Sequence, residues 1–133
     1  MRGLAARLKP VLCGVLAAGM VAIGLAHFTN VDAFAAIVPD ALPAHRALVY
    51  VSGVAEIAGG LGLAWSRTRR AAAFGLVALY VAVFPANVNM AVNHLPLGGA
   101  PVPEAVLWLR LPFQLVFVAW AYWMTRPFAP KPP

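Results

Sequence analysis

Glu56 is the residue whose setting most clearly indicates chemistry. It lies in the stretch SGVAEIAGG, residues 52–60, within an apolar run from Ala47 to Trp65. A carboxylate buried in an apolar medium without a partner is costly, so such a group is either paired with a cation or protonated. Glu56 could therefore form a buried ion pair, accept a proton or bind a polar ligand.

Further polar residues lie in two later apolar runs. Arg110 and Gln114 are four residues apart and would share one face of a helix. In FPANVNMAVNHLP, Pro85 would remove a backbone hydrogen bond and free a carbonyl group. Asn87 and Asn89 follow it on nearly opposite sides of the helix, so at most one of them easily faces the same centre. Such side chains could line a small polar pocket.

The composition identifies the solvent around these residues. The chain of 133 residues is 62% apolar and 11% charged, which leaves too few polar side chains to cover a water-soluble fold. A bilayer core needs roughly 20 apolar residues per helix. We therefore predict an all-α fold, an antiparallel bundle of four transmembrane helices at residues 11–27, 47–65, 71–93 and 105–124.

Basic residues gather at one end of this predicted bundle. Eight of the ten precede the first span, fill the turn SRTRR or follow the fourth span, and Arg46 and Arg110 are the exceptions. Under the positive-inside rule this end faces the cytoplasm. We therefore expect cytoplasmic termini and a multi-pass protein of the cell membrane. Because the basic residues sit at membrane edges, nucleic acid is not expected as a partner.

The chain is predicted to form one membrane domain, residues 1–126, followed by a disordered proline-rich tail at 127–133. An alternative for the first span is a cleaved signal peptide that ends near Ala33, Phe34 and Ala35. The apolar run is long for that role, and its loss would leave three spans. Cys13 is the single cysteine, which excludes thiol–disulfide exchange by this chain alone.

The segment FTNVDAFAAIVPDALPAHR, residues 28–46, predicts a short helix at the outer membrane surface. Asn30 could cap this helix, and Asp32 suits its first turn. Apolar side chains between Val31 and Val38 would share one face before Pro39 ends the helix. The expected result is an apolar flap over the outer mouth of the bundle.

Helix geometry places the polar residues by depth. At about 1.5 Å of rise per residue, Glu56 and Gln114 lie about 13 Å below the outer edge, and Arg110 and Asn89 about 6 to 8 Å below it. We predict an ion pair between Glu56 and Arg110, extended by Gln114 and Asn89. His27 lies at the mouth and is a candidate proton relay. In the alternative interpretation, this cluster only fixes the register of the helices.

Small residues surround Glu56 on its predicted helix. The spacings of Ala55 with Gly59 and of Ala58 with Gly62 would let neighbouring helices approach closely. Glu56 should therefore point into the bundle and away from lipid.

Metal and haem binding are not predicted. His27, His45 and His94 all fall near the outer surface, but none belongs to an HxxxH or ExxH pair. The sequence also has no nucleophile elbow and no phosphate-binding loop after a strand. We expect no catalysis by the chain alone; if it belongs to an enzyme, that enzyme is an oxidoreductase and the chain is a subunit.

Five segments occur in order along the chain: GLAHF, VPDALP, SGVAEIAGGLGL, FPANVNMA and RLPFQ. Together they resemble the DoxX-like family of small four-helix integral membrane proteins. The resemblance implies a four-helix membrane bundle and, for some members, association with quinone-linked or thiol-linked redox complexes. The cysteine pairs of some redox-active relatives are missing here. Matched position by position, the signature polar residues are His27, Glu56, Asn89, Arg110 and Gln114.

Three functions are compatible with these features. The first is an accessory subunit of a membrane redox complex that binds a quinone or a lipid head group in the outer half of the bundle. The second is a non-catalytic scaffold or assembly factor that holds a membrane redox partner or a second copy of itself. The third is a small proton-coupled transporter, which is disfavoured because the inner half has no polar path.

Overall fold

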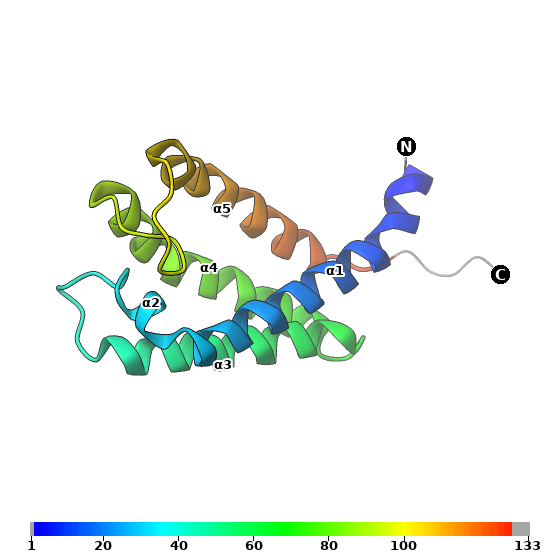
Figure 1. The fold of residues 1–133 in the computed structure, drawn as a ribbon. Coiled ribbons are helices and arrows are strands. Elements are labelled where there is room, and N and C mark those ends of the chain that lie inside the picture. Colours follow the sequence, from blue (N-terminus) through cyan, green and yellow to red (C-terminus); the bar gives the residue numbers. More distant parts are fainter. Residues whose placement is uncertain (1, 129–133) are drawn as a thin grey trace.

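Residues 2–128 are described by the computed structural model, which folds them into five α-helices (Figure 1). The helices are α1 Arg2–Thr29, α2 Val31–Ala35, α3 His45–Ala64, α4 Arg69–Val92 and α5 Glu104–Met124. Four of them, α1, α3, α4 and α5, are long and apolar enough to cross a membrane. The prediction of an all-helical bundle with four candidate spans is confirmed.

The largest difference from the predicted spans lies at the start of α1. This helix begins at Arg2 and continues through Pro10, whereas the predicted span begins at Val11. Proline removes one backbone hydrogen bond, but the preceding stretch GLAARLK consists mostly of strong helix formers. The helix therefore extends beyond the apolar run that hydropathy identifies.

Glycines bring the backbones of α1 and α3 together. A Cβ added at Gly60 would lie 2.7 Å from the carbonyl oxygen of Ala17, and one added at Gly24 would lie 2.8 Å from that of Gly53. A side chain at either position would collide with the neighbouring backbone. The close packing of α1 and α3 therefore depends on the absence of side chains at these glycines.

A second pair of glycines serves the contact between α3 and α4. A Cβ at Gly59 would lie 2.5 Å from the Leu76 side chain, and one at Gly62 would lie 2.7 Å from the Cβ of Ala72. The prediction that small residues on this helix admit close neighbours is confirmed. The glycines of α3 thus divide between two faces, one for α1 and one for α4.

The helices pack in the order α1, α3, α4, α5, and α1 and α5 contact each other little. They lie close at one end of the bundle and diverge toward the other (Figure 1). We call the first the terminal end, because it holds the start of α1 and the described end of the chain, and the second the α2 end. Buried apolar residues fill the bundle toward the terminal end; they are Cys13, Leu16, Met20, Leu63, Ala73, Leu76, Tyr80, Ala121 and Met124.

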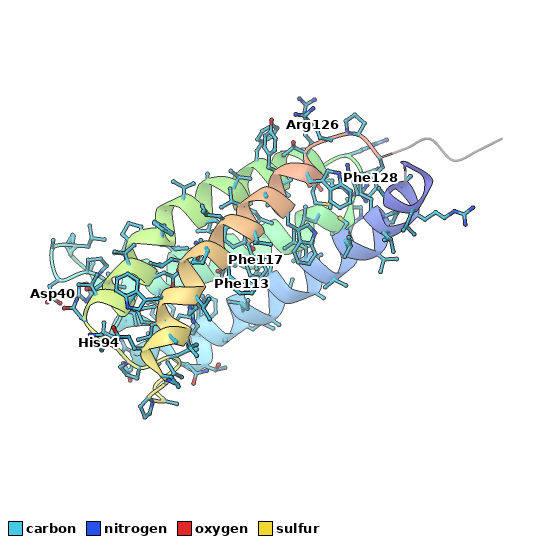
Figure 2. The ribbon with its side chains drawn as sticks, turned by 90° about the horizontal axis from the view of Figure 1, so that it is seen from above. Asp40, His94, Phe113, Phe117, Arg126 and Phe128 are labelled. Carbon is cyan, nitrogen blue, oxygen red and sulfur yellow. The ribbon has the colours of Figure 1, made fainter. Side chains whose placement is uncertain are left out.

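Lys9 connects the start of α1 to the segment that follows α5. Its Nζ donates hydrogen bonds to the carbonyl oxygens of Arg126, at 2.9 Å, and Pro127, at 3.3 Å. The ring of Phe128 lies 4.8 Å from Lys9 Nζ and 4.3 Å from the guanidinium carbon of Arg69, in cation–π contact with both. Figure 2 shows Arg126 and Phe128 at this end.

These contacts correct the predicted start of the disordered tail. Pro127 and Phe128 belong to the packed structure, because a buried amine and an apolar surface hold them. Residues 129–133 of the predicted tail lie outside the described part of the chain.

The α2 end is built from α2 and the segment that follows it. Asn30 occupies the predicted N-cap position of α2, but its side chain makes no capping hydrogen bond to the helix and donates to Thr29 Oγ1 instead. The helix ends at Ala35, and the segment after it is held by Asn89 of α4, whose amide donates to the Ile37 carbonyl oxygen at 2.9 Å. Asp32 pairs with Arg46 on the surface. The segment is thus anchored to α4 as well as to α3.

Replacing Gly60 with alanine should weaken the contact between α1 and α3. The new methyl group would overlap the Ala17 carbonyl, and forcing extra volume into a packed site costs about 1–3 kcal/mol. The control is Gly75→Ala, where a Cβ meets nothing within 4 Å and alanine favours the helix. Thermal unfolding in one detergent should show G60A below the wild type and G75A at or above it; equal effects would contradict the assigned contact.

Candidate functional site

A cavity of about 400 Å³ lies between the four long helices toward the α2 end. Most of its wall is apolar, with side chains from every long helix and from the segment after α2. Its polar lining consists of His27, Ser52, Glu56, Tyr80, Asn87, Arg110 and Gln114. Of the five predicted site residues, four line this cavity and Asn89 does not.

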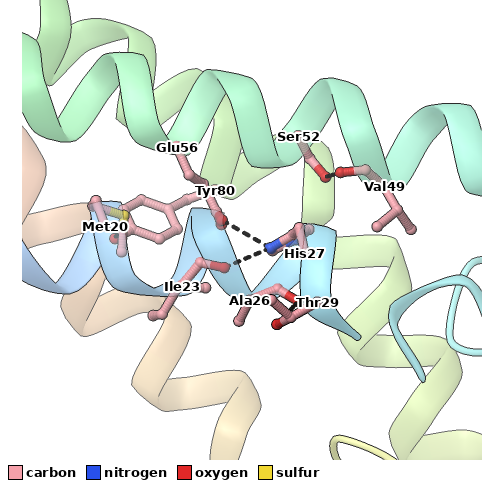
Figure 3. A network of polar contacts seen from close by, with 9 residues as sticks. All are labelled: Met20, Ile23, Ala26, His27, Thr29, Val49, Ser52, Glu56 and Tyr80. Carbon is pink, nitrogen blue, oxygen red and sulfur yellow. Dashed lines mark hydrogen bonds and ion pairs between the residues drawn. The ribbon is translucent and has the colours of Figure 1, made fainter. Parts of the chain in front are cut away.

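His27 and Glu56 meet on one side of the cavity (Figure 3). His27 Nδ1 lies 3.2 Å from Glu56 Oε2, and both side chains are more than nine-tenths buried, with 8% and 9% exposed. Gly53 makes this possible, because a Cβ there would lie 2.8 Å from the Cβ of His27. The motif Gly53-x-x-Glu56 thus provides both the space for the histidine and the carboxylate beside it.

The carboxylate of Glu56 is not satisfied by this contact. His27 Nδ1 also lies 2.8 Å from the Ile23 carbonyl oxygen, which can only accept, so that hydrogen bond requires the proton on Nδ1 to point toward Ile23. Glu56 Oε2 is buried and has no hydrogen-bond donor among the described residues. The cavity therefore contains a buried carboxylate with unused acceptor capacity.

A second polar group joins α4 and α5 across the cavity. Arg110 Nη2 donates to Asn87 Oδ1 at 3.3 Å, Asn87 Nδ2 donates to Gln114 Oε1 at 2.5 Å, and Gln114 Nε2 donates to the Tyr80 carbonyl oxygen at 2.8 Å. In both Asn87 and Gln114 the amide oxygen accepts a hydrogen bond and the amide nitrogen donates one. Arg110 uses one of its five N–H donors in these bonds.

The predicted ion pair between Glu56 and Arg110 is wrong. All four acidic side chains lie among the described residues, and none forms an ion pair with Arg110. The helices that carry the two groups, α3 and α5, do not pack against each other, since α4 lies between them. Glu56 contacts His27 of the adjacent α1 instead.

The predicted role of Asn89 also needs correction. Its amide donates to the Ile37 carbonyl and its Oδ1 accepts from Asn93, so Asn89 holds the segment after α2 and not the central cluster. Asn87 occupies the central position on the opposite side of the helix. The two-residue separation limited the inward-facing residues of this pair to at most one, and the rotation of α4 decided that it is Asn87.

Tyr80 lines the cavity but was not among the residues predicted from the sequence. Its hydroxyl donates to the Met20 sulfur at 3.0 Å, and its backbone carbonyl receives the amide of Gln114. Tyr80 and Asn87 are seven residues apart, two helical turns, and so share a face. That spacing was the available signal for the inward face of α4.

Apolar side chains from the α2 end cover the cavity. Phe34 stacks on the His27 ring with a centroid separation of 3.9 Å. Ile37, Val38 and Leu42 also line the cavity. On the opposite side, toward the terminal end, the apolar core closes the space between the helices.

The other two histidines lie away from the cavity. His45 begins α3, and His94 is exposed, with Nδ1 3.9 Å from Glu104 Oε1. Among residues 2–128, no three side chains of histidine, cysteine, aspartate or glutamate gather in a way that could hold a metal ion. Of the three histidines, His27 alone lines the cavity.

Replacing Asn87 with leucine should destabilise the protein more than replacing Asn93. The change at Asn87 removes the acceptor of Arg110 and the donor to Gln114, and unsatisfied buried polar groups cost about 1–3 kcal/mol each. The Asn93 side chain is exposed, and within residues 2–128 it bonds to Asn89 alone. Unfolding free energies measured in one detergent should fall for N87L and change little for N93L; the reverse order would contradict the network.

Comparison with known proteins identifies the family of this chain. No curated protein and no solved structure matches it. Residues 16–125 match the family model described as Domain of unknown function (DUF8561), and this range includes every residue that lines the cavity. Because the match covers most of the chain, the protein belongs to the DUF8561 family.

Proposed function

We propose that the cavity binds the polar head of a membrane-soluble molecule, a quinone or a lipid, and that the chain is an accessory, ligand-binding subunit of a membrane redox complex. The observation that carries the proposal is the Arg110 side chain. It lines the cavity and has no carboxylate partner among the described residues.

The energetics of Arg110 support a ligand with an acceptor group. A guanidinium in an apolar environment is stable only when it is paired and hydrogen-bonded. Its single protein acceptor in the described residues is the neutral Asn87 oxygen, at a long 3.3 Å. A phosphate or a quinone carbonyl would satisfy the remaining donors, and the guanidinium geometry suits such oxygens.

The surroundings suit a ligand that arrives through the bilayer. The cavity walls are mostly apolar, so they would hold the hydrocarbon part of an amphipathic molecule. The divergence of α1 and α5 toward the α2 end favours entry between these helices. The apolar core toward the terminal end disfavours transport to the opposite side, which would require a polar path.

The proposed orientation follows from charge. Lys9, Arg69 and Arg126 lie together at the terminal end, and under the positive-inside rule this end faces the cytoplasm. The α2 end, with the exposed pair of Asp32 and Arg46, would then lie at the outer surface of the cell membrane. The ligand head would accordingly bind in the outer half of the bundle.

The link to a redox complex rests on the DoxX-like resemblance. The residues that carry it, among them His27, Glu56, Arg110 and Gln114, also line the cavity. Because a single cysteine cannot form a redox-active disulfide within the chain, the proposal assigns the redox centre to a partner protein. A membrane scaffold is the alternative, and the experiment below separates the two.

Replacing Arg110 with glutamine should strongly reduce ligand retention. Native mass spectrometry of the protein extracted from its own membrane in a mild detergent should detect a bound quinone or lipid. Loss of charge-assisted hydrogen bonds should reduce the retained fraction about tenfold, the effect of about 1.4 kcal/mol. The control is Arg67→Gln, an exposed arginine of the α3–α4 turn, which should retain the ligand.

Two outcomes would count against the ligand-binding proposal. Equal retention by R110Q and R67Q would show that the molecule binds elsewhere. A stoichiometric protein partner without any small molecule would favour the scaffold.

A further inference from the structure

Two groups of opposite charge face the same cavity without meeting each other. Glu56 lies on α3 and Arg110 on α5, and these helices do not pack against each other. Glu56 Oε2 is buried without a hydrogen-bond donor among the described residues, and Arg110 has no ion-pair partner there. The protein thus presents a separated anion and cation to whatever molecule occupies the space.

We propose that the ligand head is zwitterionic, with a primary ammonium at Glu56 and a phosphate at Arg110, as in an aminophospholipid. The inference rests on the proposed function, because it names the chemical class of the ligand of that same cavity. The shared chemistry, an amino-phosphate, exists in phosphatidylethanolamine and in free phosphoethanolamine, and the apolar walls favour the lipid.

The Arg110 side matches a phosphate. Its unused N–H donors form a planar fork that can bind two phosphate oxygens at once. Asn87 and Gln114 hold this wall in place through their mutual hydrogen bond, with Gln114 fastened to the Tyr80 carbonyl. The Gln114 amide has a second N–H that the described contacts do not use, which is available to the same group.

The Glu56 side matches a primary ammonium, which carries several N–H donors and no acceptor. Ser52 lies four residues before Glu56, on the same face of α3, and also lines the cavity. Its hydroxyl donates to the Val49 carbonyl, and the Tyr80 hydroxyl donates to the Met20 sulfur. Both oxygens therefore retain acceptor capacity, so this wall has an excess of acceptors.

The excess of hydrogen-bond acceptors around Glu56 favours some classes of ligand head over others. An oxidised quinone head has acceptors and no O–H or N–H donor, so it would satisfy Arg110 and leave an ionised Glu56 without a donor. A choline head carries a positive charge but no N–H group. An ethanolamine head supplies both the charge and the donors, and it reaches from an acceptor wall to a donor wall.

The first test uses the wild-type protein. The full chain in detergent is incubated with equal amounts of phosphatidylethanolamine, its mono- and dimethyl derivatives, phosphatidylcholine and phosphatidylglycerol, all with the same acyl chains, and bound lipid is read by native mass spectrometry. Retention should fall with each added methyl group, to about one tenth in phosphatidylcholine, since one charge-assisted hydrogen bond accounts for such a factor. Equal retention of all five lipids would overturn the inference.

The second test assigns the ammonium to Glu56. Glu56→Gln should abolish the preference for phosphatidylethanolamine over phosphatidylcholine, and Glu56→Asp should keep part of it. The control is Glu104→Gln, a carboxylate outside the cavity, which should retain the full preference. Thermal unfolding of each variant shows whether it is folded, and the methylation series on the wild type tests the inference even if a variant does not fold.

The remaining outcomes distinguish this inference from the proposed function. A bound quinone that is lost in R110Q but kept in E56Q would overturn the zwitterion and leave the proposed function intact. Release of the lipid by millimolar phosphoethanolamine would support a head-group site and identify the soluble compound as a competitor. No cavity-dependent binding of any lipid or quinone would overturn both.

Discussion

The close contact of α1 with α3 is the constraint on which the rest of the structure depends. Gly24, Gly53 and Gly60 remove the side chains that would separate the two backbones. Because Gly53 lies against His27, the same contact that packs the helices also brings the histidine ring beside Glu56. A membrane bundle gains little from apolar burial against lipid, so such close backbone packing both stabilises the fold and builds the site.

The cavity lies where the close packing of the helices ends. Small residues continue the close contact from α3 to α4, whereas α1 and α5 contact each other little and approach each other at the terminal end (Figure 1). There Lys9 donates to the carbonyl oxygens of Arg126 and Pro127 and lies over the ring of Phe128. Toward the α2 end the helices diverge, and the space is lined by polar groups and covered by the segment that Asn89 anchors.

Unused donors and unused acceptors lie on different walls of the cavity. One wall ends in Arg110, whose donors exceed the acceptors around it, and the other ends in Glu56, whose acceptors exceed the donors. In water such an imbalance would be met by solvent, but in an apolar bundle each group needs a partner of its own if it is to stay ionised. The proposed ligand head completes a balance that the chain by itself leaves open.

The sequence by itself determined four apolar helices, their approximate bounds and the positions of His27, Glu56, Arg110 and Gln114 along those helices, because hydropathy and a fixed helical rise act locally along the chain. Tertiary structure alone decided the partner of each polar group. The order of the helices placed α4 between the helices of Glu56 and Arg110 and brought His27 of α1 beside Glu56. The rotation of α4 turned Asn87 inward instead of Asn89. Order and rotation arise from side-chain packing between segments distant in sequence, which no local periodicity encodes.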